Sequence, residues 1–234
     1  MTDNEKTIFA CFAHPDDELG CIGTLSKHAE KGDRVVLGFT TSGEMASFFE
    51  SMSFSEIKKT REEQGKVVGE IVDCEIKFLG YGDTSVIPSR ENALKMAKVI
   101  ADVKPDAIIA WGQNNSHPDH RGTTQLLYDG MTFARIPRLT TPVLPHRPTF
   151  HLPMFMYYEP NSPLRTCYIN VSNQYAKIEK AFDLYAEFYG WTTSDWLYVR
   201  RRNYGMACGV KYAEKFNVLS RFLPVDQYLP LNNK

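Results

Sequence analysis

The sequence lacks any apolar run that approaches the roughly 20 residues of a membrane-spanning helix. Its first six residues are polar, so the apolar region of a secretory signal peptide is also missing. The five cysteines are odd in number and include no C-x-x-C pair, which favours buried thiols in a reducing compartment over a disulfide framework. These absences predict a cytoplasmic, soluble protein.

An excess of charge of either sign is missing as well. The 27 Lys and Arg residues stand against 28 Asp and Glu residues, a net charge of -1, which argues against nucleic acid and anionic membranes as partners. The one basic run, Arg200–Arg202, is short and isolated, and we interpret it as a solvated helix face. With 234 residues, 43% of them hydrophobic, the chain is predicted to form one domain, residues 1–234.

Apolar, strand-like runs alternate with stretches of helical spacing through the first 134 residues. The strand-like runs lie at 7–12, 34–40, 75–79 and 107–111, and the helical stretches at about 19–31, 55–71 (with Ser55 as a cap), 89–103 and 120–134. Strands that alternate with helices of this length predict βαβ units. The expected fold class is therefore α/β, a doubly wound, Rossmann-like, mostly parallel sheet with helices on both faces.

The alternation breaks after residue 134, where a proline-rich segment predicts an extended loop to about residue 151. Strands are expected again at 154–158 and 166–170, and helices at 172–189 and 196–216. We interpret these elements as a C-terminal strand and helix extension of the same domain.

Two histidine–carboxylate clusters follow the first and the fourth predicted strand, at residues 13–18 and 116–120. The carboxyl ends of parallel strands meet at one edge of an α/β sheet, where ligands bind. In each cluster two polar side chains three residues apart can face one point, His14 with Asp17 and His117 with His120. Two imidazoles and one carboxylate with an open position are typical of a hydrolytic zinc site, and iron, cobalt or manganese can use the same ligands.

Other functions with this architecture make different demands on the sequence. A nucleotide-binding domain would carry G-x-G-x-x-G after the first strand, where this chain has Ala13–Asp17. A metal-dependent phosphoesterase would need two metals, and would be favoured if Asp16 and Asp119 were both ligands. Two further alternatives remain, a non-catalytic metal- or sugar-binding protein and an amidase that acts on another amide. A non-catalytic protein is expected to have lost Asp16 or one of the metal ligands.

The two clusters belong to a longer, ordered set of motifs, which continues through residues 20–25, 41–44, 60–63, 78–83 and 212–216. In this combination the sequence resembles the PIG-L / LmbE-like family of zinc-dependent de-N-acetylases. The resemblance implies removal of an N-acetyl group from an N-acetylglucosamine-type sugar or glycoconjugate, such as an inositol or malate glycoside. It also implies Zn²⁺ as cofactor (with Fe²⁺ or Co²⁺ as alternatives), an acetylated amino sugar as partner, and a homo-oligomer, either a trimer or a hexamer.

The same resemblance implies roles for individual residues. It implies three metal ligands, namely His14, Asp17 and His120. Asp16 would be the general base that takes a proton from metal-bound water, whose pKa zinc lowers to about 7. His117 would stabilise the oxyanion or protonate the leaving amine, and Asp119 would orient His117.

Further residues are candidates for substrate binding. Arg61 could grip a hydroxyl or a carboxylate through its forked donors, or be a surface charge. Asp83 could accept hydrogen bonds from sugar hydroxyls, and Glu44 could do the same or cap the next helix. Tyr157, Tyr158 and Trp191 are expected either to stack on a sugar ring or to join an aromatic core, and Arg147 is a candidate for binding a substrate anion.

The sequence departs from the family pattern in one helix and two loops. Many members carry a His-x-Ser-Gln element in the penultimate helix, where this chain has Tyr185-Ala186-Glu187-Phe188. Substrate contacts from that region are therefore not carried over. The Phe48–Phe49 loop and the proline-rich segment are expected at the mouth of the site, where loops set specificity.

Overall fold

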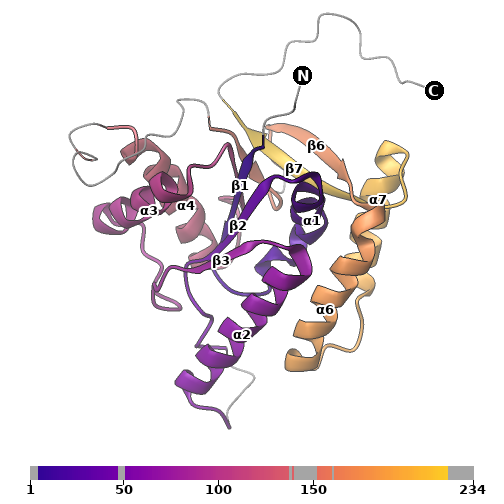
Figure 1. Ribbon diagram of the computed structural model, residues 1–234, viewed down its shortest axis with the longest axis horizontal. Coiled ribbons are helices and arrows are strands. Elements are labelled where there is room, and N and C mark those ends of the chain that lie inside the picture. The colour runs from indigo at the N-terminus through magenta and orange to yellow at the C-terminus, as the bar shows by residue number, and fades with distance from the viewer. Residues whose placement is uncertain (1–4, 47–50, 137–138, 140–151, 160, 221–234) are drawn as a thin grey trace, which may run out of the picture.

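A seven-stranded sheet forms the centre of the protein (Figure 1). The computed structural model describes residues 5–46, 51–136, 139, 152–159 and 161–220. Within them the strands, in the order β3-β2-β1-β4-β5-β7-β6, are β1 (Thr7–Phe12), β2 (Arg34–Phe39), β3 (Glu75–Phe78), β4 (Ala107–Ala110), β5 (Met154–Met156), β6 (Arg165–Asn170) and β7 (Ala213–Leu219). Strands β1 to β5 pair in parallel, whereas β7 runs antiparallel to β5 and β6. The expected α/β class with a mostly parallel sheet is confirmed.

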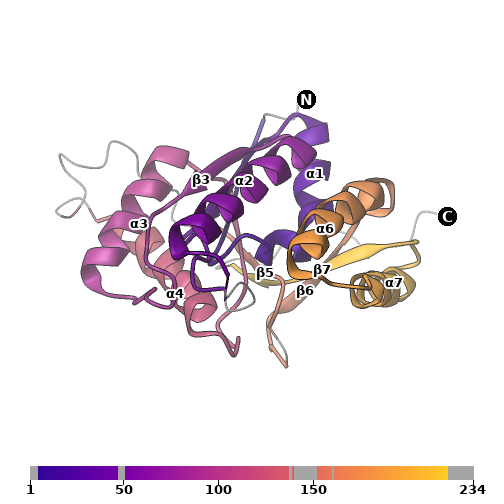
Figure 2. The same cartoon turned by 90° about the horizontal axis from the view of Figure 1, so that it is seen from below.

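Helices cover both faces of this sheet. They are α1 (Ile22–Lys31), α2 (Phe54–Val72), α3 (Arg90–Val103), α4 (Pro118–Phe133), α6 (Tyr175–Tyr189) and α7 (Asp195–Cys208), with short 3-10 helices η1 (Asp17–Gly20) and η2 (Ser172–Gln174). Because successive side chains of a strand point to opposite faces, β1 feeds two cores. Ile8 and Phe12 pack with α1, α2 and α6, whereas Phe9 and Cys11 pack with α3 and α4. Figure 2 shows these helix layers on opposite sides of the sheet.

The first four strands and helices begin and end within a few residues of their predicted positions. The predicted cap of the second helix is wrong, because Ser53 rather than Ser55 is the N-cap of α2. The Ser53 hydroxyl accepts a hydrogen bond from the Glu56 backbone N–H, and the Glu56 carboxylate accepts one from the Ser53 N–H. This reciprocal capping box fixes where α2 begins.

The predicted helix over residues 196–216 is wrong in its second half. Helix α7 ends at Cys208, because Gly209 adopts a left-handed conformation with φ 73° that terminates the helix. The chain then forms β7, which lies between β5 and β6. Its polar residues Glu214 and Asn217 are buried along with Phe216, so the strand does not show the usual alternation of polar and apolar residues.

Arg201 also departs from the prediction, because it is buried instead of lying on a solvated helix face. Its guanidinium donates to Glu214 at 2.9 Å and to the backbone carbonyl of Leu19. The Glu214 carboxylate accepts hydrogen bonds from the backbone N–H groups of Gly23 (3.1 Å) and Thr24 (2.8 Å), at the start of α1. This buried ion pair connects α7 and β7 to the segment that follows the first cluster.

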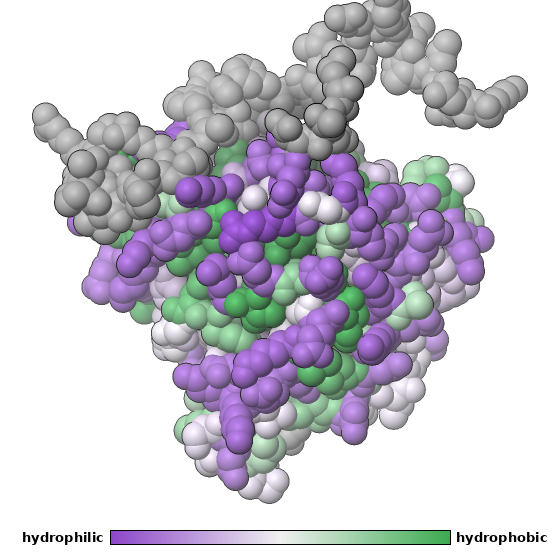
Figure 3. Space-filling model, in the orientation of Figure 1, coloured by the Kyte–Doolittle hydropathy of each residue, from purple (hydrophilic) through white to green (hydrophobic). Residues whose placement is uncertain are grey.

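The surface is polar over most of the face seen in Figure 3, with hydrophobic residues in smaller groups. Cys11 and Cys21 are buried free thiols, as expected, whereas Cys208 is exposed. Among the described residues, no helix combines the length and the apolar character that crossing a bilayer requires.

Candidate functional site

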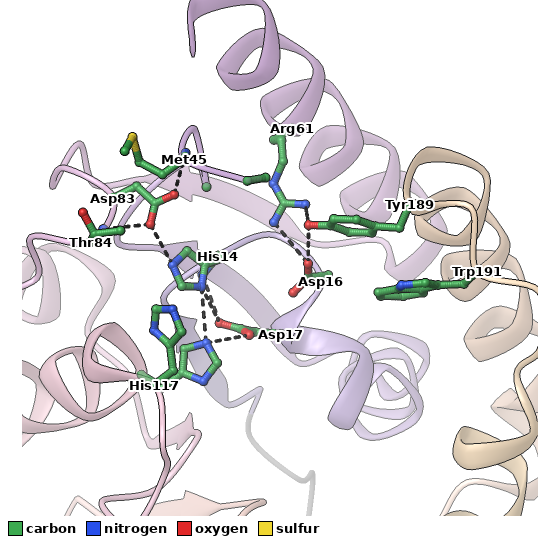
Figure 4. A pocket seen from close by; sticks show the side chains of 13 residues that line it. His14, Asp16, Asp17, Met45, Arg61, Asp83, Thr84, His117, Tyr189 and Trp191 are labelled. Carbon is green, nitrogen blue, oxygen red and sulfur yellow. Dashed lines mark hydrogen bonds and ion pairs between the residues drawn. The ribbon is translucent and has the colours of Figure 1, made fainter. Parts of the chain in front are cut away.

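A cavity of about 410 Å³ lies at the carboxyl ends of the parallel strands (Figure 4). The loops after β1, β2, β3 and β4 meet there, and α2 and the end of α6 close one side. Residues from both clusters line it together with Arg61, Asp83 and Trp191. The sheet edge that the sequence indicated is therefore where the predicted residues converge.

The first cluster turns sharply between β1 and η1. Asp16 adopts a left-handed conformation with φ 107°, which costs a residue with a side chain on the order of 1–3 kcal/mol. The turn lets Oδ2 of Asp17 accept hydrogen bonds from the backbone N–H groups of Ala13 (3.1 Å) and His14 (3.0 Å). Burial acts to raise the pKa of Asp17, but His120, His14 and the His14 N–H outweigh burial and lower the pKa to about 2.

His14, Asp17 and His120 bring three ligand atoms close together. His14 Nδ1 lies 3.3 Å from His120 Nε2, His120 Nε2 lies 3.2 Å from Asp17 Oδ1, and His14 Nδ1 lies 3.7 Å from Asp17 Oδ2. Bonds of about 2.0–2.1 Å in tetrahedral geometry separate two ligand atoms by about 3.3 Å. The three side chains can therefore hold one metal ion with little movement.

The hydrogen bonds of the two rings define which nitrogens carry lone pairs. His14 Nε2 contacts Asp83 Oδ1 at 3.1 Å and Asp119 Oδ2 at 3.4 Å, so it is the nitrogen that carries the hydrogen. His120 Nδ1 lies 3.1 Å from Asn115 Oδ1, which also accepts the His117 N–H, so it likewise donates. When both rings are neutral, the lone pairs of His14 Nδ1 and His120 Nε2 and the Asp17 carboxylate face one another. This arrangement is favourable for binding a cation.

The charges around His14 also favour a cation at this position. Burial acts to lower its pKa, but the carboxylates of Asp119, Asp83 and Asp17 outweigh burial and raise the pKa to about 10. The carboxylates that favour a proton on His14 would favour a metal ion in its place, since binding a metal releases the proton of its ligand.

Two other sets of side chains also lie close enough to share an ion, His14 with His117 and His120, and His14 with Asp83 and Asp119. The carboxylates of the second set are already engaged by the backbone. Asp83 accepts hydrogen bonds from the N–H groups of Met45 and Thr84, both at 2.8 Å, and Asp119 accepts the Thr84 N–H at 2.7 Å. These carboxylates therefore mainly fix the orientation of His14.

Asp16 extends into the cavity beside the candidate ligands His14, Asp17 and His120. Its Oδ2 accepts hydrogen bonds from the Tyr189 hydroxyl at 2.8 Å and from Arg61 Nη2 at 3.1 Å. Burial raises the pKa of Asp16, and the Arg61 charge opposes this shift. Arg61 is itself buried, 2% exposed, and also donates to the Pro15 carbonyl and the Tyr189 hydroxyl. Of the two predictions for Arg61, the surface charge is therefore wrong.

His117 lies on the opposite side of the cavity from Arg61 (Figure 4). It is the N-cap of α4, and its Nδ1 accepts a hydrogen bond from the Asp119 backbone N–H at 3.2 Å. Burial lowers the pKa of His117, with His120 and His14 adding to the shift, so a neutral ring with the hydrogen on Nε2 is favoured. Asp119 contacts His117 through its backbone N–H, whereas its carboxylate faces His14, Thr84 and Val86.

Of the remaining candidates for substrate binding, some line the cavity and others contact the residues that line it. Asp83 and Trp191 line the cavity, whereas Glu44 accepts the Asp83 N–H at 3.1 Å and does not cap α2. Tyr157 donates its hydroxyl to the Asp17 carbonyl at 2.6 Å and packs on Trp111. Tyr158 is 39% exposed, with its ring edge-on to Trp111. Arg147, Phe48 and Phe49 lie outside the described residues.

Sequence reasoning missed several residues that support the site. Trp111 stacks on His120 with ring centroids 4.5 Å apart, and Asn115 orients the same ring. Glu18, fully buried, accepts the Asp16 N–H at 2.9 Å and the Tyr185 hydroxyl at 2.6 Å. Burial raises the pKa of Glu18 to about 8, although the hydrogen bond from Tyr185 opposes the shift. The one available signal was the spacing of Tyr185 and Tyr189, four residues apart on one helix face.

Comparison with known proteins adds an independent line of information. Residues 9–130 match the PIG-L family, described as GlcNAc-PI de-N-acetylase. Diacetylchitobiose deacetylase of Thermococcus kodakarensis is 31% identical over 137 residues, which are 56% of this chain and 51% of that protein. The chain thus aligns with about half the length of this relative.

Solved structures share the fold. The structure of N,N'-diacetylchitobiose deacetylase from Pyrococcus horikoshii, in complex with its inhibitor MPG, superposes with a TM-score of 0.79 at 24% identity, covering 92% of this chain and 84% of that one. GalB, a 4-carboxy-2-hydroxymuconate hydratase from Pseudomonas putida, reaches 0.75 at 17% identity, covering 96% and 99%. Because GalB shares the scaffold, the scaffold alone does not define the reaction. The family match spans more than half of this chain and includes both histidine–carboxylate clusters, and by this match the chain belongs to the PIG-L / LmbE-like de-N-acetylase family.

Proposed function

We propose that this protein is a metal-dependent hydrolase that removes the N-acetyl group from an N-acetylglucosamine-type sugar or glycoconjugate. The observation that carries the proposal is the convergence of two imidazole lone pairs and the Asp17 carboxylate beside a separate carboxylate, Asp16. A hydrolytic metal site needs such a division between groups that hold the ion and a group that accepts a proton.

His14 Nδ1, His120 Nε2 and Asp17 are the atoms and group that would hold the ion. They are preferred over the other two sets because His117 Nδ1 already accepts the Asp119 N–H, and because backbone N–H groups reach both oxygens of Asp83 and of Asp119 but only Oδ2 of Asp17. Two imidazoles and a carboxylate suit zinc, and iron or cobalt can use the same donors. When bound there, the ion would supply Lewis acidity and lower the pKa of a coordinated water to about 7.

Asp16 would accept a proton from the attacking water. The hydrogen bonds that the described residues make to this carboxylate reach Oδ2, from Tyr189 and Arg61, so Oδ1 is the atom assigned to the proton. The proton then passes to the amide nitrogen as the carbon–nitrogen bond breaks, which yields acetate and a free amine. General base catalysis of this kind typically contributes about 10²–10⁴-fold to the rate.

His117 would stabilise the negative charge that develops on the acetamide oxygen. Its Nδ1 accepts a hydrogen bond, so the neutral ring presents the Nε2 hydrogen as a donor. Burial lowers the pKa of His117 and so favours the neutral form, which suits a hydrogen-bond donor to an oxyanion better than an acid for the amine.

The substrate side of the cavity combines polar and aromatic groups. Asp83 and Trp191 line it together with Met45, and the cavity has room for a hexosamine ring. The Arg61 guanidinium is engaged by Asp16, Pro15 and Tyr189, and we assign it to positioning Asp16 instead of gripping the substrate. The similarity to a diacetylchitobiose deacetylase supports an acetylated amino sugar as the substrate class.

The proposal is tested by acetate release from the zinc-loaded protein. The substrate panel contains N,N'-diacetylchitobiose, N-acetylglucosaminyl malate, N-acetylglucosaminyl inositol and acetylated sugar nucleotides. We expect release from at least one substrate, and loss of that release after chelation with recovery on adding zinc. Binding of a sugar without release of acetate would favour a non-catalytic protein, and release only from unrelated amides would favour a different amidase.

A further inference from the structure

Two tyrosines of α6 support Asp16, Tyr189 by direct contact with its carboxylate and Tyr185 indirectly through Glu18. They lie one helical turn apart, so their side chains leave the same face of the helix. Tyr189 donates to the Asp16 carboxylate at 2.8 Å. Tyr185 donates to Glu18 at 2.6 Å, and the other oxygen of Glu18 accepts the Asp16 backbone N–H at 2.9 Å.

The backbone of Asp16 needs such support. With φ 107°, it occupies a conformation that side-chain-bearing residues rarely adopt and that persists only where surrounding contacts enforce it. Glu18 and Tyr185 are both fully buried, so the hydrogen bonds from Tyr185 to Glu18 and from Asp16 to Glu18 are shielded from water. This chain of contacts fixes the direction in which the Asp16 side chain leaves the turn.

The side chain of Asp16 is held by a second, stacked set of groups. The Arg61 guanidinium carbon lies 5.2 Å from the centre of the Tyr189 ring, and Tyr189 stacks on Trp191 at 4.8 Å with an interplanar angle of 14°. Trp191 in turn stacks on Phe182 at 5.7 Å. Figure 4 shows Tyr189 and Trp191 nearly parallel, with the Tyr189 hydroxyl directed at Asp16. The stack limits rotation of the Tyr189 ring, so its hydroxyl approaches one oxygen of Asp16 from a fixed direction.

We infer that Tyr185 and Tyr189 are positioning residues for catalysis, which together hold the backbone and the carboxylate of Asp16 so that Oδ1 faces the attacking water. The inference rests on the proposed function, in which Asp16 is the base. Both tyrosines lie outside the matched residues 9–130, in the helix where this chain departs from the His-x-Ser-Gln pattern. Positioning of the base by α6 thus rests on residues that the family match does not cover.

The test replaces each hydroxyl singly, in Tyr189→Phe and Tyr185→Phe, with Tyr175→Phe as the matched control. Tyr175 lies on the same helix but stacks on Tyr212 at 4.0 Å, away from the first cluster. With N,N'-diacetylchitobiose as substrate, we expect Tyr189→Phe to lower kcat about 10–100-fold, because small misplacements of reacting groups have effects of this size. KM and zinc content should change less than about two-fold, and Tyr185→Phe should show a smaller loss of the same kind.

Two further measurements separate positioning from general loss of structure. In an Asp16→Ala background, Tyr189→Phe should have no further effect on kcat, because the group that it positions is absent. A crystal structure of the Tyr189→Phe protein should show the Asp16 carboxylate displaced or in more than one orientation. An undisplaced carboxylate, a kcat equal to that of Tyr175→Phe, or a further loss in the Asp16→Ala background would overturn the inference. If the unmodified protein deacetylates no substrate, the proposed function fails, and the crystal structure still decides whether Tyr189 holds Asp16.

Discussion

The two clusters share the sequence His-Pro-Asp but differ in backbone conformation and in the direction in which the aspartate side chain points. After His14 the chain passes through a left-handed residue into a 3-10 helix, so Asp16 extends into the cavity. After His117 it enters α4 directly, so the corresponding carboxylate, Asp119, turns back to His14 and to the backbone of Thr84. In both clusters the residue three positions after the histidine, Asp17 or His120, faces the proposed ion. The same short motif thus supplies the proposed base in one case and a support for His14 in the other, and the backbone conformation decides which.

The largest effect is expected at the third position after each histidine. Asp17→Ala and His120→Ala each remove one of the three proposed ligands, so both variants should lose bound zinc and all measurable acetate release. Metal analysis of the purified proteins, together with the acetate assay, checks this expectation. Full zinc occupancy in either variant would remove that residue from the ligand set.

The next effect separates the two adjacent carboxylates of the first cluster, Asp16 and Asp17. Asp16→Ala should retain zinc and lower kcat by about 10²–10⁴-fold, because it removes the proton acceptor and no ligand. The measurement is kcat with metal content determined on the same sample. Loss of zinc in Asp16→Ala to the level of Asp17→Ala would contradict the division of roles.

The segment that follows the first cluster is anchored by a distant buried ion pair, whereas Asp119 of the second cluster is held by the backbone N–H groups of Thr84 and Val86. Arg201→Met breaks the buried pair with Glu214 and should lower the free energy of unfolding by about 3–5 kcal/mol. Urea unfolding followed by circular dichroism measures the change. The matched control is Arg202→Met, whose side chain makes an exposed hydrogen bond to Lys211 and which should change stability little. Equal stability of the two variants would show that the pair does not anchor the segment.

The smallest effect is expected for the support of His14. Asp119→Asn weakens the group that orients this ring and should lower zinc affinity about 10–100-fold, with activity recovered at higher zinc concentration. Competition with a zinc-binding dye measures the affinity, and Asp129→Asn, on the same helix, is the control. A kcat loss as large as that of Asp16→Ala at saturating zinc would make Asp119 a catalytic residue.

Local sequence patterns predicted the parallel half of the fold and the location of the site. Strands β1 to β4 and helices α1 to α4 have clear periodicity, and the carboxyl ends of parallel strands must share an edge. Strand β7 was missed because its buried Glu214 and Asn217 hide the alternation, and because its place between β5 and β6 depends on contacts far apart in the sequence.

The contacts that hold the site residues in place could not be predicted from local sequence patterns for the same reason. The orientation of Asp119 depends on the loop at Thr84, and the support of Asp16 depends on Arg61 and α6. A side chain that contacts a partner 45 or 173 residues away leaves no signal in its own neighbourhood. The residue types of the motif were therefore readable, but the direction of each side chain was not.

A crystal structure of the zinc-loaded protein, with anomalous scattering recorded at the zinc edge, tests the central claim most directly. We expect one ion bound by His14 Nδ1, Asp17 and His120 Nε2, with His14 Nε2 still on Asp83 and Asp119. An ion bound through His14 Nε2 to Asp83 and Asp119, or the absence of an ion between His14 and His120, would contradict the account.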